Sequence, residues 1–338
     1  MNSSSAKSSS AKSSSALRFG GVRSIRPDRL RPLLAPLAIF LCLLLIVSVA
    51  VPQFLGGGGP SIIAQQATPI LLVALAQCVV LQVGSIDLSN ASMALLCAIL
   101  SAKTLGPLGI ASPFLCVGVV TLIGMLNGAV LTFTQIPSFA LTLGTLGVLQ
   151  AACLVITGAN VVYVTSHLEL VSWLFHVQIL TLPVVFWLSV LCAILLWAFI
   201  RFTGTGQGLM AIGFNERASI LSGLPVRRLK ITAFGLSGFL AGLAGLSVIA
   251  ISGAASSYGL GSDLLVPGVA AALAGGTAIT GGVCNPLNVV FGALFVALIP
   301  VGTAAIGVST QAQSIVYGAV LIVAVAATAS RSRTGIIK

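Results

Sequence analysis

The stretch that decides the fold is residues 231–252, which read ITAFGLSGFLAGLAGLSVIAIS and contain no charged side chain. A helix needs about 20 consecutive apolar residues to cross the hydrocarbon core of a bilayer, and this stretch is long enough. Gly238 and Gly242 within it, like Gly124 and Gly128 elsewhere, have the four-residue spacing that lets membrane helices pack closely. The stretch therefore predicts a transmembrane helix with a close neighbour.

Apolar segments of similar character recur on both sides of this stretch. Ile136-Pro137 and Asn285-Pro286 precede two of them and are typical of helix starts. We therefore predict an all-α transmembrane fold of about ten membrane-spanning helices. The other expected spans are residues 33–51, 61–83, 88–103, 107–131, 139–157, 179–200, 263–281, 286–303 and 311–329.

The overall composition agrees with a lipid environment. Hydrophobic residues make up 57% of the chain and charged residues only 6%, whereas about a quarter of a soluble domain is charged. A soluble fold could not cover its surface with so little charge. We interpret residues 33–51 as a retained membrane anchor rather than a cleaved signal peptide, because the run is long and further spans follow it.

The net charge of +11 indicates an orientation in the membrane rather than a nucleic-acid surface. Basic residues gather in three blocks, and ten spans place all three blocks on one side, with Lys103 on the other. By the positive-inside rule that side is cytoplasmic, so both termini are expected there. The blocks are Lys7, Lys12, Arg18, Arg23, Arg26, Arg29 and Arg31; Arg201, Arg217, Arg227, Arg228 and Lys230; and Arg331, Arg333 and Lys338.

These features divide the chain into three parts. Residues 1–32 are rich in Ser, Ala and basic residues and are expected to form a disordered cytoplasmic tail. Residues 33–330 form the transmembrane domain, with residues 201–230 as its one sizeable cytoplasmic loop. Residues 331–338 are expected to form a second cytoplasmic tail.

A weak internal repeat is present. Residues 84–88 (GSIDL) resemble residues 261–265 (GSDLL), and each segment follows one apolar span and precedes another. In the ten-span arrangement the two segments lie on opposite membrane faces. That relation is the one expected of two five-helix halves with inverted topology.

The chain offers little for catalysis. Its acids and histidines form no pair of carboxylates at helical spacing and no H-E-x-x-H motif, and no G-x-x-x-x-G-K-[ST] loop is present for ATP. An enzyme is therefore the weakest hypothesis, no cofactor is expected, and energy for transport must come from a partner or an ion gradient. The acids and histidines of the chain are Asp28, Asp87, Glu169, Glu216, Asp263, His167 and His176.

The seven cysteines lie in or beside apolar stretches and form no C-x-x-C pair. We interpret them as small buried free thiols rather than disulfides or metal ligands, because free Cys packs as a small hydrophobic residue. No metal site is therefore predicted. The cysteines are Cys42, Cys78, Cys97, Cys116, Cys153, Cys192 and Cys284.

Asp87 and Asp263 are the acids nearest the apolar segments. A carboxylate at membrane depth is costly and is therefore a candidate functional group. At the start of a helix it can instead act as an N-cap that accepts backbone N–H groups. Both interpretations stay open, because a broken helix start is also where a permeation path forms. The candidate pathway residues are Asp87, Ser89, Asn90, Asn127 and Asp263.

Two polar, glycine-rich stretches interrupt the apolar pattern, residues 84–90 and 275–285. Irregular backbone at membrane depth survives only where it is buried in protein or lines a wet cavity. The two stretches are therefore either ordinary loops or the lining of a path.

Within the loop 201–230, residues 215–223 (NERASILSG) read as a short helix. Asn215 can cap its start, Glu216 suits the positive end of its dipole, and Gly223 can end it. A short capped helix of this kind is suited to docking on another protein.

Four motifs follow one another along the chain: residues 84–89 (GSIDLS), 136–145 (IPSFALTLGT), 213–226 (GFNERASILSGLPV) followed by Lys230, and 274–277 (AGGT) followed by Gly281-Gly282. Together they resemble motifs of the ribose-type permease subunits of ABC importers. The resemblance covers about residues 60–330. It implies a multi-pass subunit of the bacterial inner membrane that imports a monosaccharide or a related polyol.

The resemblance also implies partners. A second permease subunit, identical or different, completes the pathway, and a periplasmic binding protein delivers the sugar. A cytoplasmic ATPase pair docks on the coupling helices. By the resemblance, the ATPase-coupling residues are Asn215, Glu216, Ala218 and Gly223.

The chain departs from the family pattern near the expected pathway. Ser85 replaces a glycine, Asn90-Ala91 replace Val-Gly, and residues 283–286 (VCNP) stand where Arg-Gly is usual. These differences leave the particular sugar open. The rival hypothesis is a secondary transporter driven by protons or sodium, for which Asp87 and Asp263 would be the candidate relays.

Overall fold

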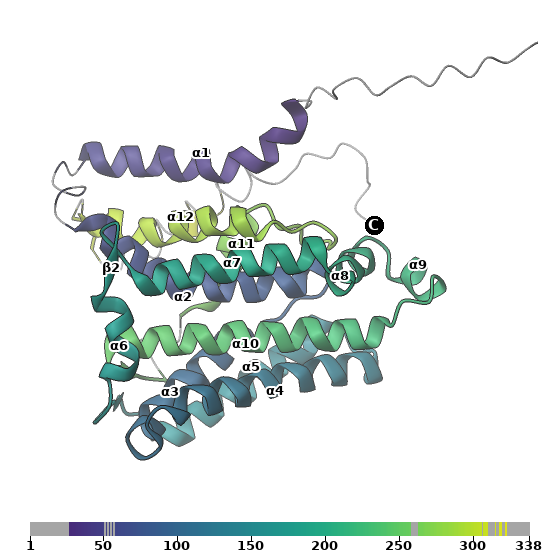
Figure 1. The fold of residues 1–338 in the computed structure, drawn as a ribbon, viewed down its shortest axis with the longest axis horizontal. Coiled ribbons are helices and arrows are strands. Elements are labelled where there is room, and N and C mark those ends of the chain that lie inside the picture. Colours follow the sequence, from purple (N-terminus) through teal and green to yellow (C-terminus); the bar gives the residue numbers. More distant parts are fainter. Residues whose placement is uncertain are drawn as a thin grey trace, which may run out of the picture.

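The computed structural model describes residues 27–50, 58–257, 263–305 and 307–309, with isolated positions between and after these ranges. The described chain is mostly helical (Figure 1). The expected span 311–329 and the tail 331–338 lie outside the described residues, apart from isolated positions in the former.

Seven helices of the described chain are long and apolar enough to cross a membrane. The helix α1 (Pro27–Ala50) has a shorter apolar part, and α11 (Leu265–Ala274) is only 10 residues long. Each expected span that lies within the described residues therefore contains a helix. The seven are α2 (Gly59–Gln82), α3 (Asn90–Leu108), α4 (Ala111–Thr134), α5 (Ser138–Thr157), α7 (Val184–Phe202), α10 (Val226–Ser252) and α12 (Pro286–Ala305).

The long helices run side by side and give the bundle two ends (Figure 1). The α9 end carries α8 (Gly204–Phe214), α9 (Glu216–Leu221) and the start of α1. The α6 end carries α6 (Glu169–His176), β2 (Gln178–Ile179) and its antiparallel partner β3 (Leu182–Pro183). At the same end, β1 (Val162–Tyr163) pairs with β4 (Ala254–Ala255). This pairing joins the α5–α6 connection to the end of α10.

The centre of the bundle is built around α2 and α10. The last two-thirds of α2 is buried almost throughout, and α10 packs against α2, α3 and α4. A Cβ atom on Gly124 would lie 2.3 Å from the Phe234 carbonyl oxygen, and one on Gly238 would lie 2.5 Å from the Val120 carbonyl oxygen. The glycine spacing therefore has the predicted consequence, a backbone-to-backbone contact between α4 and α10.

Two expected boundaries differ from the structure. The helix α1 begins at Pro27, so residues 27–32 are helical where a disordered tail was expected; proline suits the first turn of a helix. The segment 263–281 is helical only as α11 and ends at Ala274. Gly276, Gly281 and Gly282 then take positive φ angles of 84°, 92° and 76°, which no helix accommodates. Residues 275–285 are called the glycine segment below.

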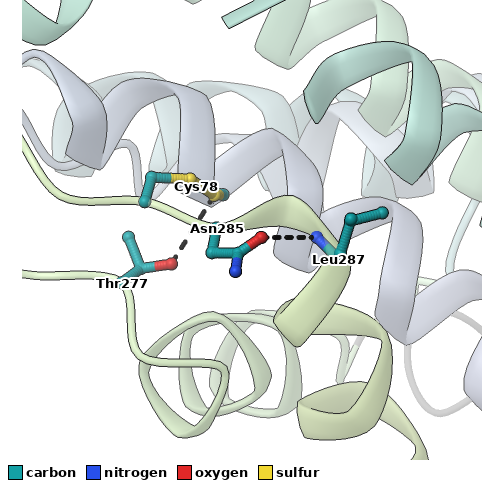
Figure 2. Close-up of a disulfide and its surroundings, with 5 residues drawn as sticks. Cys78, Thr277, Asn285 and Leu287 are labelled. Carbon is teal, nitrogen blue, oxygen red and sulfur yellow. Dashed lines mark hydrogen bonds between the residues drawn. A yellow bond between two sulfur atoms is a disulfide. The ribbon is translucent and has the colours of Figure 1, made fainter. Parts of the chain in front are cut away.

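The interpretation that the cysteines form no disulfide is wrong. Cys78 of α2 and Cys284 of the glycine segment are bonded, with their Cα atoms 6.3 Å apart (Figure 2). This pair could not be predicted, because 206 positions separate the two residues and only the fold brings the glycine segment onto α2. Next to the bond, Thr277 Oγ1 lies 3.5 Å from Cys78 Sγ, and Asn285 Oδ1 accepts the Leu287 N–H at the start of α12.

Candidate functional site

The connection between α2 and α3, residues 83–89, folds into the interior of the bundle. Gly84 has a φ of 70°, which lets the chain turn back sharply after α2. Two backbone N–H groups of the connection then donate to side chains of α5: Ile86 to Ser138 Oγ at 3.0 Å and Leu88 to Thr142 Oγ1 at 3.1 Å. Because α5 satisfies these backbone groups, the connection can leave helical geometry inside the membrane domain.

Asp87 is the centre of the polar group that this connection carries. Its side chain is fully buried. Oδ1 accepts the Ser89 N–H at 2.9 Å and the Ser89 hydroxyl at 2.6 Å, and Oδ2 accepts the Ser237 hydroxyl of α10 at 2.9 Å. Donors to both oxygens offset the cost of burying the carboxyl group.

The same hydrogen-bond network extends to α4 and α5. Asn127 Nδ2 donates to Ser89 Oγ at 3.0 Å, and Asn127 Oδ1 accepts the Thr145 hydroxyl at 2.9 Å. Asn127 is almost completely buried. A chain of hydroxyl, amide and carboxyl groups thus runs from α10 through Asp87 to α5.

A pair of side-chain amides lies next to this network. Asn90, the first residue of α3, donates from Nδ2 to Gln77 Oε1 of α2 at 2.8 Å, and both side chains are fully buried. We refer to seven residues, all buried except the partly exposed Thr145, as the buried polar cluster: Gln77, Asp87, Ser89, Asn90, Asn127, Thr145 and Ser237. Sequence reasoning missed Gln77, Thr145 and Ser237, and the one available signal was a glutamine inside an otherwise apolar span.

The structure brings together four of the predicted pathway residues and leaves one apart. Asp87, Ser89, Asn90 and Asn127 all belong to the buried polar cluster, whereas Asp263 is exposed shortly before α11. Neither aspartate is an N-cap. The capping positions are Ser89 for α3 and Leu264 for α11, and neither side chain makes a capping bond.

At the α9 end, the short helix predicted for residues 215–223 is present as α9. Asn215 is its N-cap and accepts the Ala218 N–H on Oδ1 at 3.0 Å. The helix ends where Gly223 takes a φ of 79° and donates its N–H to the Ile220 carbonyl. Glu216 Oε1 lies 2.6 Å from Lys230 Nζ of α10, an ion pair that joins α9 to the bundle.

The surface around α9 is both apolar and charged. Leu221 is 88% exposed and Ile220 is 56% exposed. Beside them, a cavity of about 730 Å³ lies between α9, the start of α10 and the α4–α5 connection, and its lining includes Ile136, Glu216, Arg227 and Arg228. Exposed apolar side chains next to a charged cavity are typical of a surface that binds another protein.

A contact between glycines joins the α9 end to the buried connection. Gly213 is the penultimate residue of α8. A Cβ atom at this position would lie 2.0 Å from the Gln82 carbonyl oxygen and 2.2 Å from the Gly282 nitrogen. Gly282 in turn donates its N–H to that Gln82 carbonyl at 3.0 Å. The helix α8 therefore lies in direct backbone contact with the end of α2 and with the glycine segment, and α9 follows it directly in the chain.

The described residues offer no group of three or more His, Cys, Asp or Glu side chains that could hold a metal ion. The arrangement is instead one of neutral hydrogen-bonding groups around a single carboxyl. Such a site can recognise a polar solute by hydrogen bonds, and α8, which contacts the end of α2, can transmit movement from the exposed helix α9.

Comparison with known proteins identifies the family. A family model described as "Branched-chain amino acid transport system / permease component" matches residues 59–325. The chain is 32% identical to the D-allose transport system permease protein AlsC of Escherichia coli K12, over 77% of this chain and 80% of the relative. It is 29% identical to the ribose import permease protein RbsC of the same strain, over 86% and 91% of the two chains.

A third relative is the L-arabinose ABC transporter permease protein AraH of Azospirillum brasilense, 28% identical over 85% of this chain and 84% of the relative. No solved structure matches the chain. The family model and the first relative each cover well over two-thirds of the chain. The chain therefore belongs to this permease family and is a multi-pass membrane subunit of an ABC importer, not an enzyme.

Proposed function

We propose that this chain carries a monosaccharide or a related polyol from the periplasm to the cytoplasm. In this proposal a separate cytoplasmic ATPase drives the movement through residues 213–223. The observation that supports it most is the contact of Gly213 with Gln82 and Gly282, because it connects the exposed helix α9 with the segment that holds the buried polar cluster.

The substrate class is supported by the chemistry of the cluster and by the relatives. Its side chains supply hydroxyls and amides, which both donate and accept hydrogen bonds, as a sugar hydroxyl does. The proteins to which the chain is most similar include permeases named for D-allose, ribose and L-arabinose. Asp87, Ser89, Asn90 and Asn127 are the proposed pathway residues within the cluster, and Asp263 is proposed to contact the solute separately from them.

The proposed topology has ten spans in two inverted halves, with both termini in the cytoplasm. It is supported by the helices found in the expected segments and by the position of the start of α1 at the α9 end (Figure 1). The basic residues Arg217, Arg227 and Arg228 also lie at this end, in agreement with a cytoplasmic location.

The proposed partners are the ATPase, a periplasmic sugar-binding protein and a second permease subunit, identical or different. Asn215, Glu216, Ala218 and Gly223 would hold α9 in the shape that the ATPase binds. The helix α5 packs on α3 and α4 and leaves its other side exposed at Gly144, Gly147 and Val148, a face that a second subunit could cover.

The coupling role is tested by Glu216→Lys. The reversed charge repels Lys230 and is expected to abolish both sugar uptake and sugar-stimulated ATP hydrolysis by the assembled importer, while the amount of permease in the membrane stays normal. Glu169→Lys is the matched control, because Glu169 is an exposed glutamate at the α6 end. Normal uptake by Glu216→Lys would contradict the coupling role.

A further inference from the structure

Four polar side-chain atoms of the described residues are buried without a hydrogen-bond partner. They are Gln77 Nε2, Gln82 Nε2, Gln82 Oε1 and Asn90 Oδ1. A buried polar group without a partner destabilises the folded state, so such groups are rare in folded proteins. Their presence on α2 and at the start of α3 therefore needs an explanation.

Gln77 and Asn90 are the informative pair, because their amides already face each other. Asn90 Nδ2 donates to Gln77 Oε1 at 2.8 Å, which leaves the donor Nε2 and the acceptor Oδ1 unused on the same two groups. Turning both amides over exchanges the atoms but still leaves one donor and one acceptor. The pair thus presents a donor and an acceptor together whichever way the amides are assigned.

A hydroxyl group can satisfy both atoms at once, because its oxygen accepts from the donor while its hydrogen donates to the acceptor. A carboxylate can only accept and an ammonium group can only donate. The pair therefore favours a neutral solute with hydroxyl groups over an ion.

The position of the pair agrees with a binding role. Asn90 directly follows Ser89 of the buried polar cluster, and Gln77 neighbours Cys78, which is bonded to the glycine segment. Both residues are fully buried between helix ends, and interrupted helices are where transporters form their solute sites. A solute here would also lie close to the segment that α8 contacts through Gly282.

We propose that Gln77 and Asn90 form a binding site for one hydroxyl group of the transported solute, with Gln77 as a specificity-determining residue. The site rests on the proposed function, since it deepens the assignment of a sugar or polyol. It adds a residue, Gln77, that determines which hydroxyl pattern the permease accepts.

The test compares solutes that differ by one hydroxyl. The full importer is supplied with D-ribose, D-allose or L-arabinose, and then with the single-deoxy derivatives of whichever sugar it transports fastest. Wild-type protein is expected to prefer the parent sugar over at least one derivative by roughly two- to tenfold, the value of one hydrogen bond. Gln77→Met, which keeps the length but lacks the amide, is expected to abolish that preference, because it lowers uptake of the parent sugar more than uptake of that derivative.

Two further variants keep the test independent of folding. Gln66→Met is the matched control, since Gln66 is an exposed glutamine on the same helix, and it should retain the wild-type preference. Asn90→Leu removes the other half of the site and should abolish the same preference as Gln77→Met.

The inference is overturned if Gln77→Met lowers the uptake of all solutes in the same proportion. It is also overturned if this variant keeps every wild-type preference for the parent sugar over its deoxy derivatives. Failure of the proposed function looks different. A wild-type importer that transports no monosaccharide or polyol contradicts the assignment of a sugar substrate, and the hydroxyl site then fails with it.

Discussion

Asp87 makes three hydrogen bonds inside the bundle, two with Ser89 and one with Ser237. Asp87→Leu would leave two buried hydroxyls and one N–H without their acceptor, at a cost of about 1–3 kcal/mol for each group. We expect a lower melting temperature of the purified permease in detergent and loss of sugar uptake. Asp87→Asn keeps an acceptor oxygen and should have the smaller effect on both. Equal melting temperatures for wild type and Asp87→Leu would contradict this account of the network.

The disulfide between Cys78 and Cys284 can be tested by counting the free thiols of the chain. Of the seven cysteines, Cys42, Cys97, Cys116, Cys153 and Cys192 are free. The denatured but unreduced chain should therefore gain five maleimide groups in a mass spectrum, and seven after treatment with a thiol reductant. In Cys284→Ser, reduction should expose no additional thiol. Seven labels without reduction would show that the bond does not form in the membrane.

Single residues of the site differed in how well the sequence predicted them. Asp87, Ser89, Asn90 and Asn127 were predicted because polar side chains near apolar spans are conspicuous. Ser237 and Thr145 were not, because a hydroxyl in a membrane helix usually bonds to the carbonyl of its own preceding turn. Only the packing of α4, α5 and α10 shows that Ser237 donates to Asp87 and that Thr145 donates to Asn127, although the Thr145 hydroxyl also lies 3.2 Å from the Leu141 carbonyl of its own preceding turn.

The helix α8 connects the exposed helix α9 to the interior, and its glycines allow a specific test. Gly213→Ala places a Cβ atom 2.0 Å from the Gln82 carbonyl oxygen, so α8 must move away from the end of α2. We expect ATP hydrolysis to continue while sugar uptake falls at least tenfold. Gly204→Ala is the control on the same helix, because nothing lies within 4 Å of its Cβ position. Equal uptake by the two variants would contradict a role for this contact in coupling.

Most of the helices could be predicted because a span needs a long apolar run, and such runs are visible without tertiary information. The end of α11 could not. Residues 275–281 (GGTAITG) carry no charged side chain, so hydropathy extends the helix through them. The backbone leaves helical geometry at Gly276 and Gly281, and Gly281 and Gly282 pack against Gly84 and Phe214, contacts that exist only in the folded bundle.

The orientation of the entire subunit is a prediction that reporter fusions can check. Reporters active only in the cytoplasm should work when fused after residue 205, and reporters active only in the periplasm should work after residue 160. The reason is that these positions lie at the α9 and α6 ends of the bundle, and an odd number of spans separates them. A cytoplasmic signal from both positions would contradict the ten-span arrangement.

The measurement that tests the central claim most directly is the energy source of transport. Proteoliposomes that contain the permease with its ATPase, with ATP enclosed and the binding protein and labelled sugar outside, should accumulate the sugar. Accumulation should continue when ionophores collapse the proton and sodium gradients, and it should stop when ATP is replaced by a non-hydrolysable analogue. Accumulation that needs an ion gradient and proceeds without ATP hydrolysis would contradict the assignment of this chain as an ATP-driven sugar permease.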